Sequence, residues 1–190
     1  VLLSGSNANC NNSIDTSNLA EGLPVNYTSF VSDRVYENTN YTLYGQVIFA
    51  CGTNITVRNN YFGSEGLNIF NVNSSSFVNN SISLSNGSGL VMITSDYNNI
   101  ENNTINALSG HGIRTLSADY NTFKNNLVNN TVAYCFDLSS SSQNTFIDGY
   151  ISSNTRAVQF WTSSHNIFDN LYISGSTGID FSSTYNITIY

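Results

Sequence analysis

Few residues of this sequence have side chains that act as acids, bases or nucleophiles. The chain contains 12 Asp and Glu, two His and three Cys among 190 residues. Asp96 and Asp119 both lie in the tripeptide Asp-Tyr-Asn. In stacked repeats their carboxylates would lie about one strand spacing apart, roughly 4.8 Å, which suits paired catalytic acids or a Ca²⁺ site. Asp-Tyr-Asn is equally good turn chemistry, and the capping of a turn is the favoured role.

A second candidate site surrounds the only Gly-His-Gly sequence. Gly110-His111-Gly112 is similar to an element of β-helical polygalacturonases, and Arg114 follows two residues later. Glycoside hydrolysis uses paired carboxylic acids a few ångströms apart, however, and no Asn-Thr-Asp or Asp-Asp element accompanies this histidine. The sequence therefore predicts no catalytic residue, leaves enzymatic activity undecided and favours a tight turn before a strand.

Two pairs of residues are candidates for carbohydrate binding. Tyr150 and Tyr172 share a repeat position, where exposed aromatic rings could stack on sugar rings or on a neighbouring subunit. Arg114 and Asp137 share an outward position one repeat apart, where they could contact a polysaccharide. Ordinary surface pairing, worth under about 1 kcal/mol, is the favoured role of the charged pair, and a plain strand surface is an equal alternative for the tyrosines.

The sulfur-containing residues predict at most one structural bridge. Cys10 and Cys51 lie where a disulfide could pin the N-terminal region onto the first full repeat, and the sequence leaves open whether it forms. Cys135 occupies a slot otherwise filled by Gly or Ala, which indicates a small buried thiol. Two His, one Met and three scattered Cys make no cluster of soft ligands, so the sequence predicts no metal site and no cofactor.

The composition excludes several classes of protein. The net charge is −7, which disfavours nucleic acid and anionic membrane surfaces as partners. Asn, Ser and Thr number 32, 29 and 17, and Asn and Ser are poor helix formers, so a helical protein is excluded. No run of 18 apolar residues occurs, and the first ten residues lack the features of a signal peptide. We expect a mature, soluble segment without membrane insertion.

Self-similarity at a period of 20–23 residues is the strongest signal. In copies of the motif N-x-F-x-N-N-x-I, the third position, which is apolar, falls at residues 57, 77, 100, 123, 146, 168 and 189. Eleven residues before each of these positions lies a segment with alternating apolar residues, the mark of a half-buried strand. Its inward pairs are Val47/Phe49, Leu67/Ile69, Leu90/Met92, Ile113/Thr115, Phe136/Leu138, Val158/Phe160 and Ile179/Phe181.

A unit of this size with one apolar stripe per strand closes a core only by stacking on its copies. The sequence therefore predicts an all-β fold, a single-stranded parallel β-helix of about seven rungs. One position per rung is expected to form an inward ladder of hydrogen-bonding side chains that also tolerate left-handed turns. Its members are Asn59, Asn79, Asn102, Asn125, Asp148 and Asn170. Residues 46–190 are assigned to the β-helix, and residues 1–45 to an N-terminal cap and a first irregular coil.

These repeats resemble the right-handed parallel β-helix repeats of the NosD-like group, which includes carbohydrate-binding and sugar-hydrolysing domains and many surface proteins. The resemblance covers residues 46–190 and implies a right-handed coil. It bears on fold far more than on activity. Members of the group are linked to copper delivery, and that role is not carried over because the soft ligands are scattered.

Ten N-x-S/T sequons occur, close to the number that chance gives for so many Asn, Ser and Thr residues. The expected glycosylation sites are those in the cap or in turns, namely Asn26, Asn40, Asn86 and Asn129. Asn79 and Asn102 are expected to stay bare, because they belong to the ladder assigned to the interior.

Low charge, small polar side chains and few reactive groups favour a non-catalytic extracellular protein at the cell surface, a component of a surface layer, a filament or an adhesin. Its expected partners are itself or neighbouring surface-protein domains, met through an open C-terminal rung, with the chain continuing past Tyr190 or a neighbour covering that end. The alternative is a carbohydrate-binding or carbohydrate-active module with a polysaccharide partner, which rests mainly on resemblance.

Overall fold

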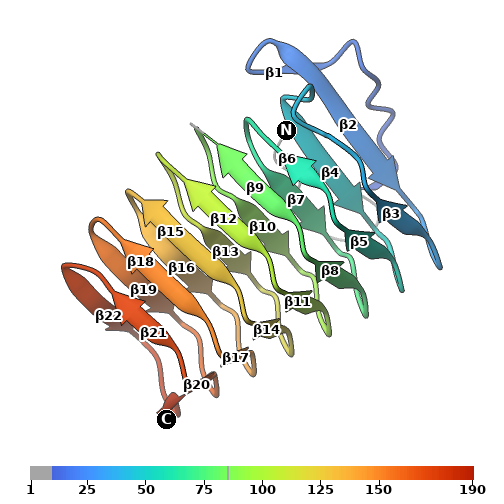
Figure 1. Cartoon of the computed structure of the whole chain (residues 1–190). Coiled ribbons are helices and arrows are strands. Elements are labelled where there is room, and N and C mark those ends of the chain that lie inside the picture. The colour runs from blue at the N-terminus through green and yellow to red at the C-terminus, as the bar shows by residue number, and fades with distance from the viewer. Residues whose placement is uncertain (1–9, 85) are drawn as a thin grey trace.

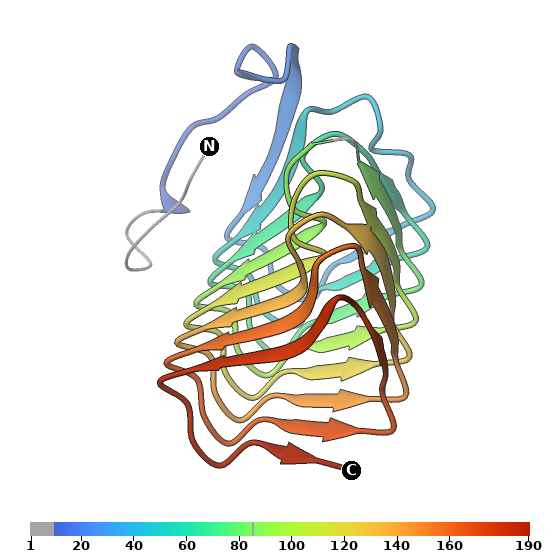
Figure 2. The same ribbon diagram turned by 90° about the vertical axis from the view of Figure 1, so that its left-hand side faces the viewer.

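The protein is a solenoid in which short parallel strands stack coil upon coil (Figure 1). The computed structural model describes residues 10–84 and 86–190, and that part of the chain contains 23 strands and no α-helix. A complete coil contributes one strand to each of three sheets, and the coils stack at a separation of 20–23 residues (Figure 2). An all-β parallel β-helix of about seven turns is therefore confirmed.

Three sheets form the sides of the solenoid. The first contains, in spatial order, β1 (Leu19–Ala20), β2 (Leu23–Ser29), β4 (Gln46–Ala50), β7 (Leu67–Phe70), β10 (Leu90–Ile93), β13 (Ile113–Leu116), β16 (Tyr134–Ser139), β19 (Arg156–Trp161) and β22 (Thr177–Ser182). The second contains β3 (Val35–Glu37), β5 (Thr56–Arg58), β8 (Ser76–Val78), β11 (Asn99–Glu101), β14 (Thr122–Lys124), β17 (Thr145–Ile147), β20 (Ile167–Asp169) and β23 (Thr188–Ile189). The third contains β6 (Tyr61–Phe62), β9 (Ser81–Leu84), β12 (Thr104–Ala107), β15 (Leu127–Thr131), β18 (Tyr150–Ser153) and β21 (Tyr172–Ser174).

The core is a column of apolar side chains in register. Phe77, Ile100, Phe123 and Phe146 are paired in successive strands and are at most 2% exposed. The rings of Phe123 and Phe146 stack with centroids 4.6 Å apart, and Phe168 continues the column at 4.5 Å. Such pairs add about 0.5–1.5 kcal/mol beyond the burial of their area.

The predicted inward pairs of the first sheet are buried from Val47/Phe49 to Val158/Phe160. Phe181 differs: its ring stacks on Phe160 with centroids 5.4 Å apart, yet it is 51% exposed. The difference arises because Phe181 lies on β22, the last strand of the first sheet, which pairs with β19 alone.

The residues predicted to form the inward asparagine ladder each lie one position before the residue that actually points inward. Its members all have left-handed φ angles between 52° and 56° and are all exposed; they are Asn59, Asn79, Asn102, Asn125, Asp148 and Asn170. Each forms the sharp corner between the second and third sheets, so its side chain points outward. Burial therefore gives no reason for Asn79 and Asn102 to stay bare of glycan.

The following residue turns inward and builds the ladder. Its buried members are Asn60, Asn80, Asn103 and Asn126. Asn103 Oδ1 accepts hydrogen bonds from the backbone N–H and the side-chain Nδ2 of Asn80, at 2.9 and 3.1 Å. Asn103 Nδ2 donates to the carbonyl of Phe77 at 2.8 Å and to Asn126 Oδ1 at 3.1 Å. Each inward amide thus satisfies backbone groups that the corner would leave unpaired.

A second buried ladder lies at the corner between the first and second sheets. It comprises Asn98, Asn121, Asn144 and Asn166. Asn121 repeats the same geometry: its Oδ1 accepts from the backbone N–H of Asn98 at 2.9 Å, and its Nδ2 donates to the carbonyl of Ser95 at 3.0 Å. Buried amides therefore fix both corners in the coils of Asn98/Asn103 and Asn121/Asn126, and one of the two corners in the coils of Asn60, Asn80, Asn144 and Asn166.

The coils begin earlier than residue 46. β2 pairs in parallel with β4, placing Asn26 opposite Val47, and β3 pairs with β5, so residues 1–45, assigned to a cap and a first irregular coil, include a coil with one strand in each of the first two sheets. It is hard to recognise because its inward positions on β2 carry Asn26 and Thr28 instead of apolar residues. β1 forms an antiparallel hairpin with β2 and occupies its free edge.

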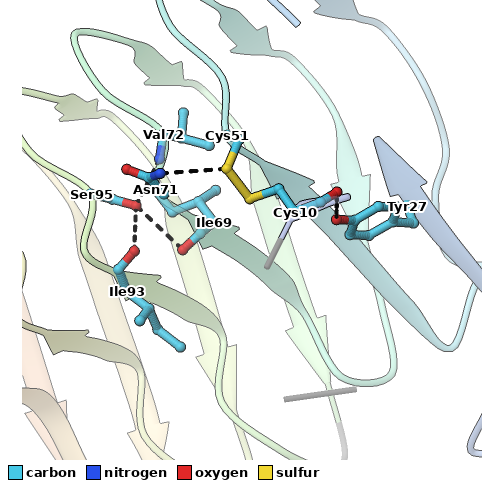
Figure 3. Close-up of a disulfide and its surroundings, with 8 residues drawn as sticks. All are labelled: Cys10, Tyr27, Cys51, Ile69, Asn71, Val72, Ile93 and Ser95. Carbon is cyan, nitrogen blue, oxygen red and sulfur yellow. Dashed lines mark hydrogen bonds between the residues drawn. A yellow bond between two sulfur atoms is a disulfide. The ribbon is translucent and has the colours of Figure 1, made fainter. Parts of the chain in front are cut away.

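A disulfide joins the N-terminal segment to the solenoid. Cys10 and Cys51 are bonded, and Tyr27 Oη donates to the carbonyl of Cys10 at 2.8 Å (Figure 3). Residues 10–18, which precede β1, run outside the stacked coils (Figure 2). Beneath it lies a small buried cluster on the outer face of the first sheet, formed by Cys10, Val25, Ile48, Ala50 and Phe70. This segment therefore shields apolar outward residues of the first coils from water.

Candidate functional site

The outer face of the first sheet gathers most of the candidate chemistry. The strand register places Val91, Arg114 and Asp137 in one outward row that runs along the solenoid. Gln159 and Asp180 continue that row on β19 and β22. β16 and β19 are six residues long, so each can present two outward side chains or more.

Arg114 and Asp137 form an ion pair within this row. Arg114 Nε lies 3.2 Å from Asp137 Oδ2, the guanidinium side chain is 46% exposed, and the carboxylate side chain is 10% exposed. The structure thus brings together the two charged residues expected from the sequence. The pair holds a nearly buried carboxylate, and it leaves the terminal nitrogens of Arg114 at the surface to act as hydrogen-bond donors.

His111 is a further member of this cluster. Its Nε2 lies 3.8 Å from Asp137 Oδ2, and its ring stacks on Tyr134 with centroids 5.6 Å apart. Burial lowers the pKa of His111, and the charge of Arg114 lowers it further, whereas the carboxylate of Asp137 raises it. We therefore describe His111 as a neutral ring that packs beside the ion pair, with a buried Nδ1 that has no described partner.

A hollow of about 210 Å³ lies beside this cluster on β4, β7 and β10. Its apolar lining includes Ile48, Phe70, Val91 and Ile93, and its polar lining includes Gln46, Glu65, Asn68, Ser88 and Arg114. Asn68 Nδ2 is buried and has no hydrogen-bond partner among the described residues. A buried amide without a partner is costly, so the hollow favours a ligand that offers an acceptor oxygen.

Trp161 lies on the same face and was not singled out by the sequence. It is the only tryptophan, it is 53% exposed, and no ring contact to it is found among the described aromatic residues. It pairs in register with Ser139 and Ser182 on the outward side of β19. The signal that could have found it is the alternation Val158, Phe160 inward and Gln159, Trp161 outward.

The tyrosine pair lies on a different sheet. Tyr150 and Tyr172 are paired on β18 and β21 of the third sheet and are 44% and 58% exposed. Their rings stack on each other with centroids 4.8 Å apart and planes 4° apart. The facing surfaces of the two rings are therefore in contact with each other, and a sugar ring meets only their edges, their hydroxyls and the outer faces of the stack.

Asp96 and Asp119 lie one coil apart and each caps a backbone N–H. Asp96 Oδ1 accepts from the backbone N–H of Asp119 at 2.8 Å, and Asp119 Oδ1 accepts from that of Ser142 at 2.6 Å. Burial raises the pKa of Asp96, and the charge of Asp119 adds to this. Each carboxylate thus accepts a hydrogen bond from the backbone of the next coil, 23 residues further along the chain, and links successive coils.

The predicted sequons occupy different environments. Asn40 and Asn86 are exposed outside strands, whereas Asn26 lies in β2 and Asn129 in β15, each partly buried. The expectation that Asn129 lies in a turn is wrong, because β15 extends through it in register with Asn106 of β12. Exposure therefore favours Asn40 and Asn86 as acceptor sites.

The donor set does not fit a copper site. Cys10 and Cys51 are bonded to each other, and Met92 is fully buried in the core. Burial raises the pKa of Cys135 to about 11, which keeps its thiol protonated. Within residues 10–84 and 86–190, no three His, Cys, Asp or Glu side chains group around a point that could hold a metal ion.

The comparison with protein families agrees with the fold. The family described as periplasmic copper-binding protein (NosD) matches residues 4–190, which includes the coil that precedes residue 46. No curated protein matches the chain. Among the described residues there is no helix long and apolar enough to cross a membrane. With nearly its whole length matched and its coils stacked as a parallel β-helix, the chain belongs to the NosD family.

Proposed function

We propose that this protein is a non-catalytic structural component at the cell surface, a rigid β-helix that forms part of a surface layer, a filament or an adhesin. The observation that supports this best is the pair of buried asparagine ladders, which tie successive coils together at two corners. Buried networks with every member satisfied make a structure rigid. A stiff rod with few reactive side chains suits a load-bearing or spacing role.

A location outside the cytoplasm is part of this proposal. The disulfide between Cys10 and Cys51 supports it, because such bonds persist in oxidising compartments. The family description refers to periplasmic proteins, which is consistent with such a location. In a glycosylating host, Asn40 and Asn86 are the proposed carriers of sugar, and mass spectrometry of the secreted protein tests this.

Electron microscopy of the purified protein tests the structural role. We expect regular filaments or sheets, built by contact of the protein with itself or with neighbouring surface domains. A protein that stays monomeric at high concentration and binds no purified surface component would refute the proposed role.

Copper binding is not proposed for this chain. The family description mentions copper, but the cysteines are bonded or buried and the methionine lies in the core. Copper sites use accessible thiolate, thioether or imidazole ligands gathered at one point. Isothermal titration with Cu(II), and with Cu(I) under reducing conditions, is expected to show no stoichiometric binding.

Carbohydrate binding is the second candidate function. The hollow beside Arg114, with its partnerless Asn68 amide, favours it. Apolar walls and a few polar groups are typical of small-ligand sites. An array of neutral and acidic glycans tests it directly, and release of reducing sugar from bound glycans would show that the module is also an enzyme.

A further inference from the structure

We propose that the outer face of the first sheet binds a linear neutral polysaccharide along the axis of the solenoid, from the hollow on β7 and β10 to Trp161 on β19. This proposal rests on the second candidate function and assigns its location and its class of ligand. The surface is named here the outer strip. It consists of Asn68, Val91, Arg114, Asp137, Gln159, Ile93, Leu116, Ser139 and Trp161.

The outer strip has two parallel rows of different character. The strand register aligns Val91, Arg114, Asp137 and Gln159 in a largely polar row, and Ile93, Leu116, Ser139 and Trp161 in a more apolar row. Members of the two rows are two residues apart on each strand, on the same side of the sheet. A sugar ring has the same division, with C–H groups on its faces and hydroxyls around its rim. One row can therefore stack on the rings while the other bonds the hydroxyls.

The two ends of the outer strip supply the strongest contacts. At one end, the hollow buries a partnerless Asn68 Nδ2, which needs an acceptor oxygen. At the other end, Trp161 is 53% exposed and stacks on no described aromatic ring, unlike Tyr150 and Tyr172. Three strand spacings separate Val91 on β10 from Gln159 on β19, roughly 14 Å, so the occupant is longer than one sugar unit.

The charges favour a neutral ligand. Asp137 already lies 3.2 Å from Arg114, so the guanidinium carries little uncompensated charge toward a ligand. Asp180 ends the polar row, Glu65 lines the hollow, and the whole chain has a net charge of −7. An anionic polysaccharide would be repelled by this field, whereas hydroxyls can both accept from Asn68 and donate to Glu65.

Fluorescence of the single tryptophan tests this proposal, because Trp161 lies on the proposed surface. The probes are linear hexasaccharides of β-1,4-glucose, α-1,4-glucose, β-1,3-glucose and β-1,4-mannose, with hexagalacturonate as the anionic comparison. We expect saturable quenching or a spectral shift with at least one neutral probe, and none with hexagalacturonate at low salt. No change with any neutral probe would overturn the proposal.

Variants locate the site by calorimetry. Val91→Phe, which fills the hollow from an outward position, and Trp161→Ala are each expected to weaken binding at least tenfold. Asn68→Leu removes the partnerless amide and is expected to act in the same direction. The matched control is Tyr172→Ala on the third sheet, expected to change affinity less than twofold. Binding that depends on Tyr172 but not on Val91 would retain carbohydrate binding and overturn this location.

Discussion

Replacement of one inward asparagine tests the hydrogen-bond ladder that holds the coils together. In Asn103→Ala, four hydrogen bonds disappear, and the backbone N–H of Asn80 loses its acceptor in a site that is about 3% exposed. An orphaned buried donor costs about 1–3 kcal/mol and each of the three further bonds contributes about 1 kcal/mol, so we expect a loss of about 4–6 kcal/mol. For a chain of this length that corresponds to a decrease in Tm of roughly 8–24 °C.

The neighbouring residue provides the matched control. Asn102 is exposed at a φ of 56°, a conformation that glycine adopts without steric cost. Asn102→Gly is therefore expected to change the free energy of unfolding by less than about 0.5 kcal/mol. Both variants are measured by thermal and guanidinium unfolding followed by circular dichroism. A larger loss in Asn102→Gly than in Asn103→Ala would refute the inward assignment and restore the register expected from the sequence.

Three other perturbations probe the disulfide, the free thiol and the carboxylate of Asp96. Reduction of Cys10–Cys51, or the double variant Cys10→Ser with Cys51→Ser, removes a bond between residues 41 positions apart, which contributes up to about 4 kcal/mol by loop entropy. We expect faster proteolysis between residues 10 and 19. Unchanged cleavage would contradict the role of the disulfide. Cys135 has a pKa of about 11 because it is buried, so at pH 8 native protein should resist iodoacetamide and unfolded protein should react, whereas rapid native labelling would show an accessible thiol. Burial raises the pKa of Asp96, so its contribution to stability is present below its unfolded value of 3.8 and is lost as the pH rises through the folded value. Asp96→Asn keeps an oxygen acceptor for the backbone N–H of Asp119. We expect the variant to match the stability of the parent protein at pH 3 and to be at least as stable at pH 7. A loss of stability at pH 7 alone would show that the charge itself is needed.

The repeat period determines most of the fold, because inward apolar residues such as Phe123 and Phe146 recur at the separation that also pairs their strands. The pair of consecutive asparagines in several coils is where the sequence does not predict which side chain points inward. Asn102 and Asn103 are chemically identical, and only backbone geometry decides that the first takes the left-handed corner and the second turns inward. The first coil is expected only as an irregular one for a related reason, since Asn26 occupies an inward position that later coils fill with apolar residues.

The candidate site is harder to predict because it uses the positions that the repeat leaves free. Arg114 and Asp137 could be paired from their shared slot, and the register brings them together. His111 joins them from the segment that precedes β13, where segment lengths vary between coils and no period applies. The hollow depends on packing between loops and strands, and the partnerless amide of Asn68 is visible only once its surroundings are known.

Inward and outward positions are under different physical constraints in this fold. An inward side chain contacts its equivalents in the coils before and after it, as Asn103 contacts Asn80 and Asn126, so a change there disturbs three coils at once. An outward side chain does not have to pack against equivalent side chains in this way. One outward row of the first sheet therefore carries Asn68, Val91, Arg114 and Asp137 in succession. Recognition chemistry in this chain is therefore to be sought on the outer faces of its sheets, where one coil can change without loss of the stack.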